Sequence, residues 1–352
     1  MASDSLAVYV LDVGQGDCTF IVPPQNGGAI LFDCNDAYVA ERFVSNHGLH
    51  HLEAVVVSHL DRDHIRGIVP FLKNHFAAGR TVGRLFIGLD RQPNAGEKSE
   101  IAILLLHALE WSVTPPCPGF SLADPTRTAG PVVVASGVDW SVELMLPFYE
   151  QRLRATGLGG ENPNLCSAVL RVSHSGTSVL VTGDSPLSAL EKIDDRSLSA
   201  RAVRTPHHAG DSDRGGRMDS FDKLYEAVTP SHAIVSVGTN NQHKHPLPEH
   251  LSAARLSDRS CRVRCTQLTP RCHPDPWSLR DDALLVSGGV TWPYRHRAMP
   301  GDPKRAPTQE TPCAGSIAIW IDPTGGMHVE PAVGSDHDLF VGKLSHPLCE
   351  AV

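Results

Sequence analysis

The segment SHLDRDHIRG, residues 58–67, constrains this chain more than any other stretch. It places two histidines and two aspartates between His59 and His64, directly after the apolar run Ala54–Val57. Small β-branched residues in a run predict a strand buried on both faces, and such a strand delivers the next residues to the carboxyl edge of a sheet, where α/β folds bind ligands. Imidazole and carboxylate together suit zinc, manganese or iron. The motif therefore predicts a divalent metal site at a strand end.

Three later strands are predicted to end in polar clusters of the same kind. They are Ser178–Val181 before Gly183-Asp184, Ala202–Arg204 before TPHHAGD, and Ala233–Val237 before GTNNQHKHP. Helices are predicted at 65–75, 97–111 and 186–192. Strands that alternate with helices are typical of an α/β fold, and packing alone does not explain histidine and aspartate at four strand ends.

Composition describes an ordinary globular protein of 352 residues, with 41% apolar and 20% charged residues. No apolar run reaches the roughly 18 residues that a membrane span needs. The N-terminus lacks a basic region and Asp12 interrupts its apolar run, so we expect no signal peptide and a cytoplasmic protein with no membrane contact. The net charge of −8 gives no global attraction to nucleic acid, although the arginine-rich segments 201–204 and 295–297 could act locally.

Nine cysteines form an odd number without a dense framework, which favours free thiols in a reducing compartment. Cys261, Cys265, Cys272 and His273 offer four donors for zinc. Their spacing is poor for a zinc knuckle and residues 262–264 are predicted to form a strand, so we do not predict a structural zinc there.

The predicted domain organisation is one core with an insertion. Residues 1–272 form the core, and 273–312, which contains seven prolines, is a Pro-rich insertion. Residues 313–335 supply a return strand to the core and 336–352 form a C-terminal tail. The polar, Gly-rich stretch 148–162 is predicted to be a surface loop.

Seven motifs in this order resemble the metallo-β-lactamase fold, and most closely its ComEC-type branch, found as the C-terminal domain of the competence protein ComEC and in free-standing relatives. They are LDVGQGDC, LFDCN, SHLDRDHIRG, NPNLCSAVLRV, VTGDS, TPHHAGD and SVGTNNQHKHP. The resemblance covers Leu6 to Ile321. It implies a four-layered αβ/βα sandwich with a metal site at the sheet edges. It also implies hydrolysis by a hydroxide activated at a dinuclear site, of an ester, amide, thioester or phosphodiester bond.

The same resemblance assigns the metal ligands. His59 and Asp61 would bind the first metal, Asp63 and His64 the second, and Asp184 would bridge the two. Asn164 stands near the position where many relatives have a third histidine on the first metal, which would leave that metal more weakly held.

Three histidines remain for the second metal and the substrate. The resemblance favours His245 as the last metal ligand and His208 as a contact to phosphate or a proton donor to the leaving oxygen, without excluding the reverse. His207 belongs to the catalytic set or is a buried histidine bonded to a carbonyl. Arg66 reaches a substrate phosphate or lies in solvent.

Two further aspartates, Asp17 and Asp33, either orient the ligating histidines or cap turns. Asp61 stands where lactamases have histidine, and with a bridging Asp184 it favours phosphodiesters. We expect a metal-dependent phosphodiesterase or nuclease with two divalent ions, zinc or manganese. The alternatives are hydrolysis of a small phosphoester or nucleotide signal, and a non-catalytic subunit that binds a protein partner through residues 273–312.

Overall fold

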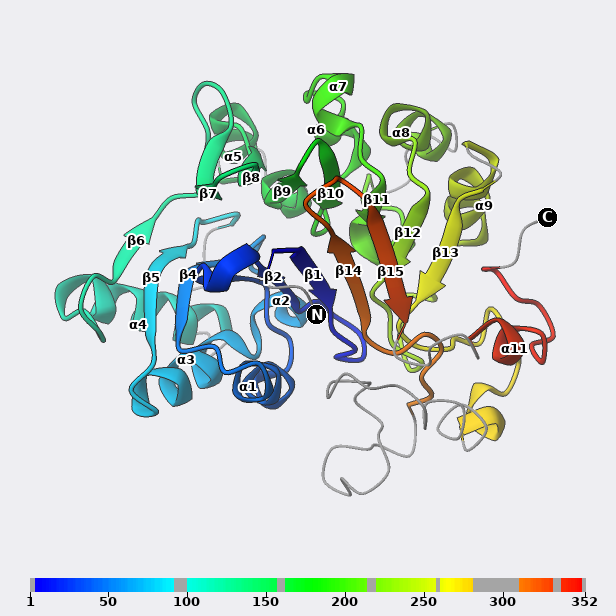
Figure 1. Ribbon diagram of the computed structural model, residues 1–352, viewed down its shortest axis with the longest axis horizontal. Helices are drawn as coiled ribbons and strands as arrows, with labels where there is room; N and C mark the ends of the chain where they lie inside the picture. Colours follow the sequence, from blue (N-terminus) through cyan, green and yellow to red (C-terminus); the bar gives the residue numbers. More distant parts are fainter. Residues whose placement is uncertain are drawn as a thin grey trace.

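Two β-sheets pack face to face, and helices cover the outer face of each (Figure 1). The computed structural model describes residues 4–91, 100–156, 162–213, 220–257, 260–280, 310–331 and 337–349. Its layers run helix, sheet, sheet, helix, so the predicted four-layered αβ/βα sandwich is confirmed.

The first sheet has eight strands in the order β15-β14-β1-β2-β3-β4-β5-β6. Their bounds are β1 Leu6–Val10, β2 Thr19–Val22, β3 Ala29–Phe32, β4 His51–Val56, β5 Thr81–Phe86, β6 Ser121–Ala123, β14 Ile317–Ile321 and β15 Met327–Pro331. The strands from β3 to β6 run parallel, and the other neighbours are antiparallel.

The second sheet has seven strands in the order β13-β12-β11-β10-β9-β8-β7. Their bounds are β7 Val132–Gly137, β8 Trp140–Leu146, β9 Val169–His174, β10 Thr177–Val181, β11 Ala202–Arg204, β12 His232–Val235 and β13 Arg262–Cys265. The strands from β10 to β13 are parallel, so their carboxyl ends share one edge.

The helices lie mainly on the outer faces of the sheets. The α-helices are α1 Ala37–Asn46, α2 Arg62–Ile65, α3 Ile68–Ala77, α4 Glu100–Val113, α5 Tyr149–Thr156, α6 Leu187–Leu190, α7 Asp195–Leu198, α8 Ser220–Val228, α9 Pro248–Ser257 and α11 His337–Val341. Short 3₁₀ helices are η1 Pro24–Asn26, η2 Pro163–Cys166, η3 Pro206–Ala209 and η4 Pro276–Leu279. Within the described segments, every helix is too short or too polar to cross a membrane.

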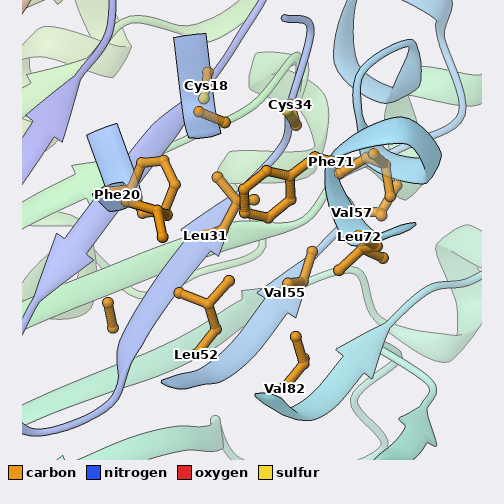
Figure 2. Packing of buried hydrophobic residues seen from close by; sticks show 14 of the residues in the cluster. Cys18, Phe20, Leu31, Cys34, Leu52, Val55, Val57, Phe71, Leu72 and Val82 are labelled. Atoms are coloured by element: carbon orange, nitrogen blue, oxygen red, sulfur yellow. The ribbon is translucent and has the colours of Figure 1, made fainter. Parts of the chain in front are cut away.

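The core has three apolar layers because both faces of each sheet are covered. Along β1, Tyr9 packs on the helix side, whereas Val8 and Val10 pack toward the second sheet, as the two-residue period of a strand requires. Figure 2 shows part of the helix-side layer, with Phe20, Leu31 and Phe71 among its residues. In the same layer the rings of Phe20 and Phe43 stack with centroids 4.4 Å apart. A third layer lies between the second sheet and helices α6 to α9.

The predicted helix 65–75 is two helices, α2 and α3, which meet at Gly67. The Gly67 N–H donates to the Cys34 carbonyl at 2.7 Å, and a Cβ at Gly67 would lie 2.7 Å from both that oxygen and the Ala37 nitrogen. This close approach fixes the residues just after β4 against those just after β3.

The predicted loop 148–162 is wrong over its first half, because Tyr149–Thr156 forms helix α5. The Phe148 N–H donates to the buried Gln151 side chain at 2.7 Å and so caps the helix start. Residues 157–161 lie outside the described part of the chain.

The domain division stays a prediction, but the C-terminal end of the proposed insertion is anchored. Thr311 is fully buried, and its carbonyl accepts from the Leu268 N–H at 2.8 Å. Residues 281–309 lie outside the described part. The return segment supplies two strands, since β14 pairs with both β1 and β15. In the tail, α11 packs with Cys272 and Cys313.

Candidate metal centre

The carboxyl ends of strands from both sheets converge on one polar site. Asp33 follows β3, the segment His59–His64 follows β4, and Asp184 follows β10. His207 and His208 follow β11 in η3. Parallel strands place their ends at one edge, and the packing of the two sheets brings both edges together, as the positions of these residues in the sequence predicted.

Asp184 lies at the middle of the site and is 3% exposed. Its Oδ1 is 3.3 Å from the Nε2 of His64 and 3.8 Å from that of His208. Its Oδ2 is 3.8 Å from the Nε2 of His59 and 3.7 Å from that of His207. Each carboxylate oxygen therefore faces its own pair of imidazoles.

A buried hydrogen-bond chain orients two of these imidazoles. His64 Nδ1 lies 2.7 Å from Asp33 Oδ2, which also accepts from the Ser58 hydroxyl at 2.6 Å. Since Ser58 donates to Asp33, its oxygen accepts from His59 Nδ1 at 3.0 Å. With Nδ1 protonated in both rings, each Nε2 presents a lone pair to the site. Of the two predicted roles for Asp33, the contacts favour orientation of histidines.

His208 is oriented in the same way by the main chain. Its Nδ1 donates to the Ser236 carbonyl at 2.7 Å, and its Nε2 is 3.3 Å from Asp63 Oδ2. The Asp63 carboxylate thus joins His208 on the Oδ1 side of Asp184.

The donor set fits a divalent cation. Asp17, His64, Asp184 and His208 each offer one ligand atom, and these atoms lie within 4.8 Å of one another. Over the described residues, the buried Nε2 atoms of His59, His64 and His208 and the Oδ1 of Asp184 have no hydrogen-bond partner. Buried polar atoms are rarely left unsatisfied, and converging lone pairs of this kind suit a metal ion.

Arg204 balances part of the negative charge of the site. Its guanidinium is 1% exposed, pairs with Asp17 and lies 3.9 Å from Asp184 Oδ1. The hypothesis that the segment 201–204 forms a nucleic-acid patch is therefore wrong for Arg204, because its charge is buried against carboxylates. An arginine that ends an apolar strand just before TPHH was the available signal for this role.

Arg91, which the sequence analysis missed, pairs with Asp61 at 2.6 Å through Asp61 Oδ1. The other oxygen of Asp61 is 3.3 Å from His59 Nε2. Asp90, following β5, holds Arg91 Nε at 2.9 Å and the Leu60 N–H at 2.6 Å. The ion pair thus holds one Asp61 oxygen away from the site and leaves the other beside His59.

The charges of the site shift the pKa values of its groups in opposite directions. Burial alone would raise the pKa of Asp184, but His64, His208 and His207 outweigh it and lower that pKa well below its usual range. Burial opposes a charge on His64, but Asp184 and Asp33 raise its pKa well above the usual value. A proton and a cation would therefore compete for the same atom, His64 Nε2.

His245 lies beside this group, further from its middle. Its ring centroid is 5.1 Å from that of His207 and 6.3 Å from that of His208. Burial, and then its histidine neighbours, lower the pKa of His245 to about 3. The place beside Asp63 and Asp184 that the resemblance implied for His245 is thus taken by His208.

The remaining predicted residues lie around the site. Asn164 is buried in η2, three residues before Ser167, whose hydroxyl accepts from the Asp184 N–H at 2.9 Å. Arg66 is exposed and its Nε donates to the Asn35 carbonyl at 3.1 Å. Neither contact tests the roles predicted for Asn164 and Arg66.

Comparisons with known proteins give distant relatives, and no family model matches the chain. ComE operon protein 3 of Bacillus subtilis (strain 168) is 22% identical over 260 residues, which cover 68% of this chain and 29% of that protein. The metallo-β-lactamase fold protein YhfI of Bacillus subtilis has a TM-score of 0.45 at 13% identity, over 74% of this chain and 96% of YhfI. Human tRNase Z, short form, has a TM-score of 0.42 at 12% identity, over 66% of this chain and 92% of that structure.

The chain thus spans less than a third of the length of its curated relative. The four layers of the fold are observed directly in this chain's own sheets and helices. The two packed sheets with helices on their outer faces have the layers that the resemblance implies, and the chain is similar in sequence to ComE operon protein 3.

Proposed function

We propose that this protein is a metal-dependent hydrolase that acts on phosphodiesters, as a phosphodiesterase or nuclease with two divalent cations. The observation that carries the proposal is the position of Asp184, whose two oxygens face separate pairs of imidazoles. Two cations that share one carboxylate suit in-line displacement at phosphorus, because both charges stabilise the attacking and leaving oxygens.

The chain's own residues would hold the cations in two groups. His59, Asp61 and one oxygen of Asp184 would hold the first, and Asp63, His64, His208 and the other oxygen of Asp184 the second. When bound, such cations lower the pKa of water and neutralise charge that develops on phosphate. Zinc and manganese both match this mixture of imidazole and carboxylate donors.

The hydrogen bonds at Nδ1 would hold the histidine rings in the orientation that metal binding needs. Asp33, Ser58 and the Ser236 carbonyl hold the Nδ1 protons of His59, His64 and His208, so the Nε2 lone pairs need no reorganisation on binding. His245 lies beside this group and would contact the substrate. Arg66, between α2 and α3, would contact a substrate phosphate.

Location in the cytoplasm is part of the proposal. Eight of the nine cysteines are buried, and the structure has them as thiols and not as disulfides. Buried thiols of this kind are typical of reducing compartments, which supports a cytoplasmic protein.

The test is hydrolysis by protein loaded with zinc or manganese. The substrates are bis-p-nitrophenyl phosphate, single- and double-stranded DNA, RNA and cyclic nucleotides, and the control is Asp184→Asn. We expect metal-dependent cleavage of at least one phosphodiester, reduced in the control. Cleavage of cyclic nucleotides alone would favour the small-substrate alternative. Binding of two cations without cleavage of any substrate would contradict the proposal and leave the non-catalytic, partner-binding alternative.

A further inference from the structure

His207 and His59 both lie near the Oδ2 atom of Asp184. The Nε2 of His207 is 3.7 Å from that oxygen, and the Nε2 of His59 is 3.8 Å from the same oxygen. His59 Nε2 is in turn 3.3 Å from Asp61 Oδ2. Four ligands of a tetrahedral cation with bonds of about 2.0–2.2 Å lie roughly 3.3–3.6 Å apart. The three distances between these donor atoms, 3.3, 3.7 and 3.8 Å, are close to that range.

The backbone of η3 makes this position possible. His207, His208 and Ala209 have φ values of 50°, 55° and 57°, a left-handed run that residues with a side chain rarely adopt. The His207 N–H donates to the Gly183 carbonyl at 3.1 Å, and the Gly210 N–H to the His207 carbonyl at 2.7 Å. The turn directs two consecutive imidazoles to the two oxygens of one carboxylate. Strain of this kind persists where the surrounding structure enforces it, most often at functional sites.

His207 differs from the other three histidines in how it is held. Within the described residues, its Nδ1 is buried without a hydrogen-bond partner, whereas the Nδ1 atoms of His59, His64 and His208 each have one. Its side chain is also 24% exposed, against 0–2% for the other three. A ligand that nothing orients and that solvent reaches binds a cation more weakly.

We propose that His207 supplies the second imidazole of the first metal, beside His59, and takes the place of the histidine that many relatives have at the position of Asn164. The inference rests on the proposed dinuclear function. It makes the first metal the weaker and more exchangeable of the two, because its added ligand is the one without an orienting partner.

The experiment is titration of the metal-free protein with Mn²⁺ by calorimetry, with the spin coupling of the Mn²⁺ pair followed by electron paramagnetic resonance. The variants are His207→Asn, His208→Asn and Asn164→Ala. Asparagine tolerates positive φ, so the first two variants keep the turn intact. His243→Ala is the control, because His243 is an exposed histidine near the site.

We expect the unaltered protein to bind two Mn²⁺ with unequal affinity. His207→Asn should weaken the lower-affinity site at least 10-fold, abolish the coupled signal and leave the tighter site unchanged. His208→Asn should weaken the tighter site, whereas Asn164→Ala and His243→Ala should leave both sites as they are.

Two results would overturn the inference and separate it from the proposed function. If both sites keep their affinity in His207→Asn, or if Asn164→Ala alone weakens the first site, His207 is no ligand while the dinuclear proposal stands. If the unaltered protein takes up no divalent cation, the proposed function fails together with this inference.

Discussion

Asp184 gives the sharpest test among single residues, because its two oxygens serve two sides of the site. Asp184→Asn keeps the shape of the side chain but removes the shared charge. We expect phosphodiester hydrolysis to fall by at least ~10²-fold, a few kcal/mol of transition-state stabilisation, while the fold survives. Initial rates with bis-p-nitrophenyl phosphate measure the hydrolysis, and circular dichroism checks that the fold survives. Full activity in the variant would refute the two-metal mechanism.

A second prediction distinguishes the role of His208 from that of His245. His208→Ala should reduce occupancy of the second metal site, because its Nε2 lies beside both Asp63 and Asp184. His245→Ala should lower turnover and leave metal content unchanged. Elemental analysis of the two variants after identical metal loading checks this, and metal loss in His245→Ala alone would restore the assignment based on the resemblance.

Single residues of the site were predictable as far as strand ends determine their place. His59, His64 and Asp184 lie together because each stands within eight residues after a strand whose end was visible in the sequence. The choice between His208 and His245 was not predictable, since it depends on a left-handed turn that no residue type in TPHHAG demands. The pair Arg204 and Asp17 was missed because its partners meet only when the two sheets pack.

Helices α2 and α3 show how an element boundary can carry function. Gly67→Ala would place a Cβ 2.7 Å from the Cys34 carbonyl and the Ala37 nitrogen, which are backbone atoms that cannot rotate away. We expect a loss of about 1–3 kcal/mol in the free energy of unfolding. Metal affinity should fall too, because α2 carries Asp63 and His64.

Urea denaturation and Mn²⁺ calorimetry of Gly67→Ala measure the two effects. Gly342→Ala is the matched control, since its Cβ would meet no atom closer than 3.6 Å. Equal stability of the two variants would show that the loop yields and that the glycine is not required for packing.

Helices and strands were predictable where apolar residues recur with a clear period. Their bounds were not predictable where contacts with neighbouring elements determine them. The strand before the metal motif was expected at 54–57, and β4 is His51–Val56, because its first residues pair with β5 despite their polarity. The break at Gly67 was missed, since Ile65, Ile68, Phe71 and Leu72 keep helical spacing across it. Helix α5 was missed because its sequence is polar on most faces.

For the whole molecule, the site predicts that metal binding depends on pH. Burial opposes a charge on His59, His64 and His208, but neighbouring aspartates raise the pKa of each above the usual 6.5. Metal binding needs the neutral rings, so it must release protons, and affinity should rise as the pH rises through the range above 6.5. Calorimetry at pH 7 in two buffers with different enthalpies of ionisation counts the protons. Release of none would contradict the raised pKa values.

The Pro-rich segment is the subject of the second whole-molecule prediction. Arg280 Nε donates to the Glu310 carbonyl at 3.2 Å, so the residues that flank 281–309 are in contact. We expect a short Gly-Ser linker in their place to leave folding and Mn²⁺ uptake intact while it alters the choice of substrate or protein partner. Thermal unfolding and the substrate panel check this. Failure of the shortened protein to fold would place the segment in the core.

Strand β1 lies between β2 and β14, and its register with β14 joins Leu6 to Ile321. The Asp12 N–H likewise donates to the Ser316 hydroxyl across 304 residues. During synthesis, β1 therefore lacks its neighbour β14 until most of the described chain has been made. The β14-facing edge of β1 can meanwhile pair with another chain. Contacts so distant in sequence slow folding. The pairings from β1 to β6 can thus form in the order of synthesis, whereas the pairing of β1 with β14 must form late.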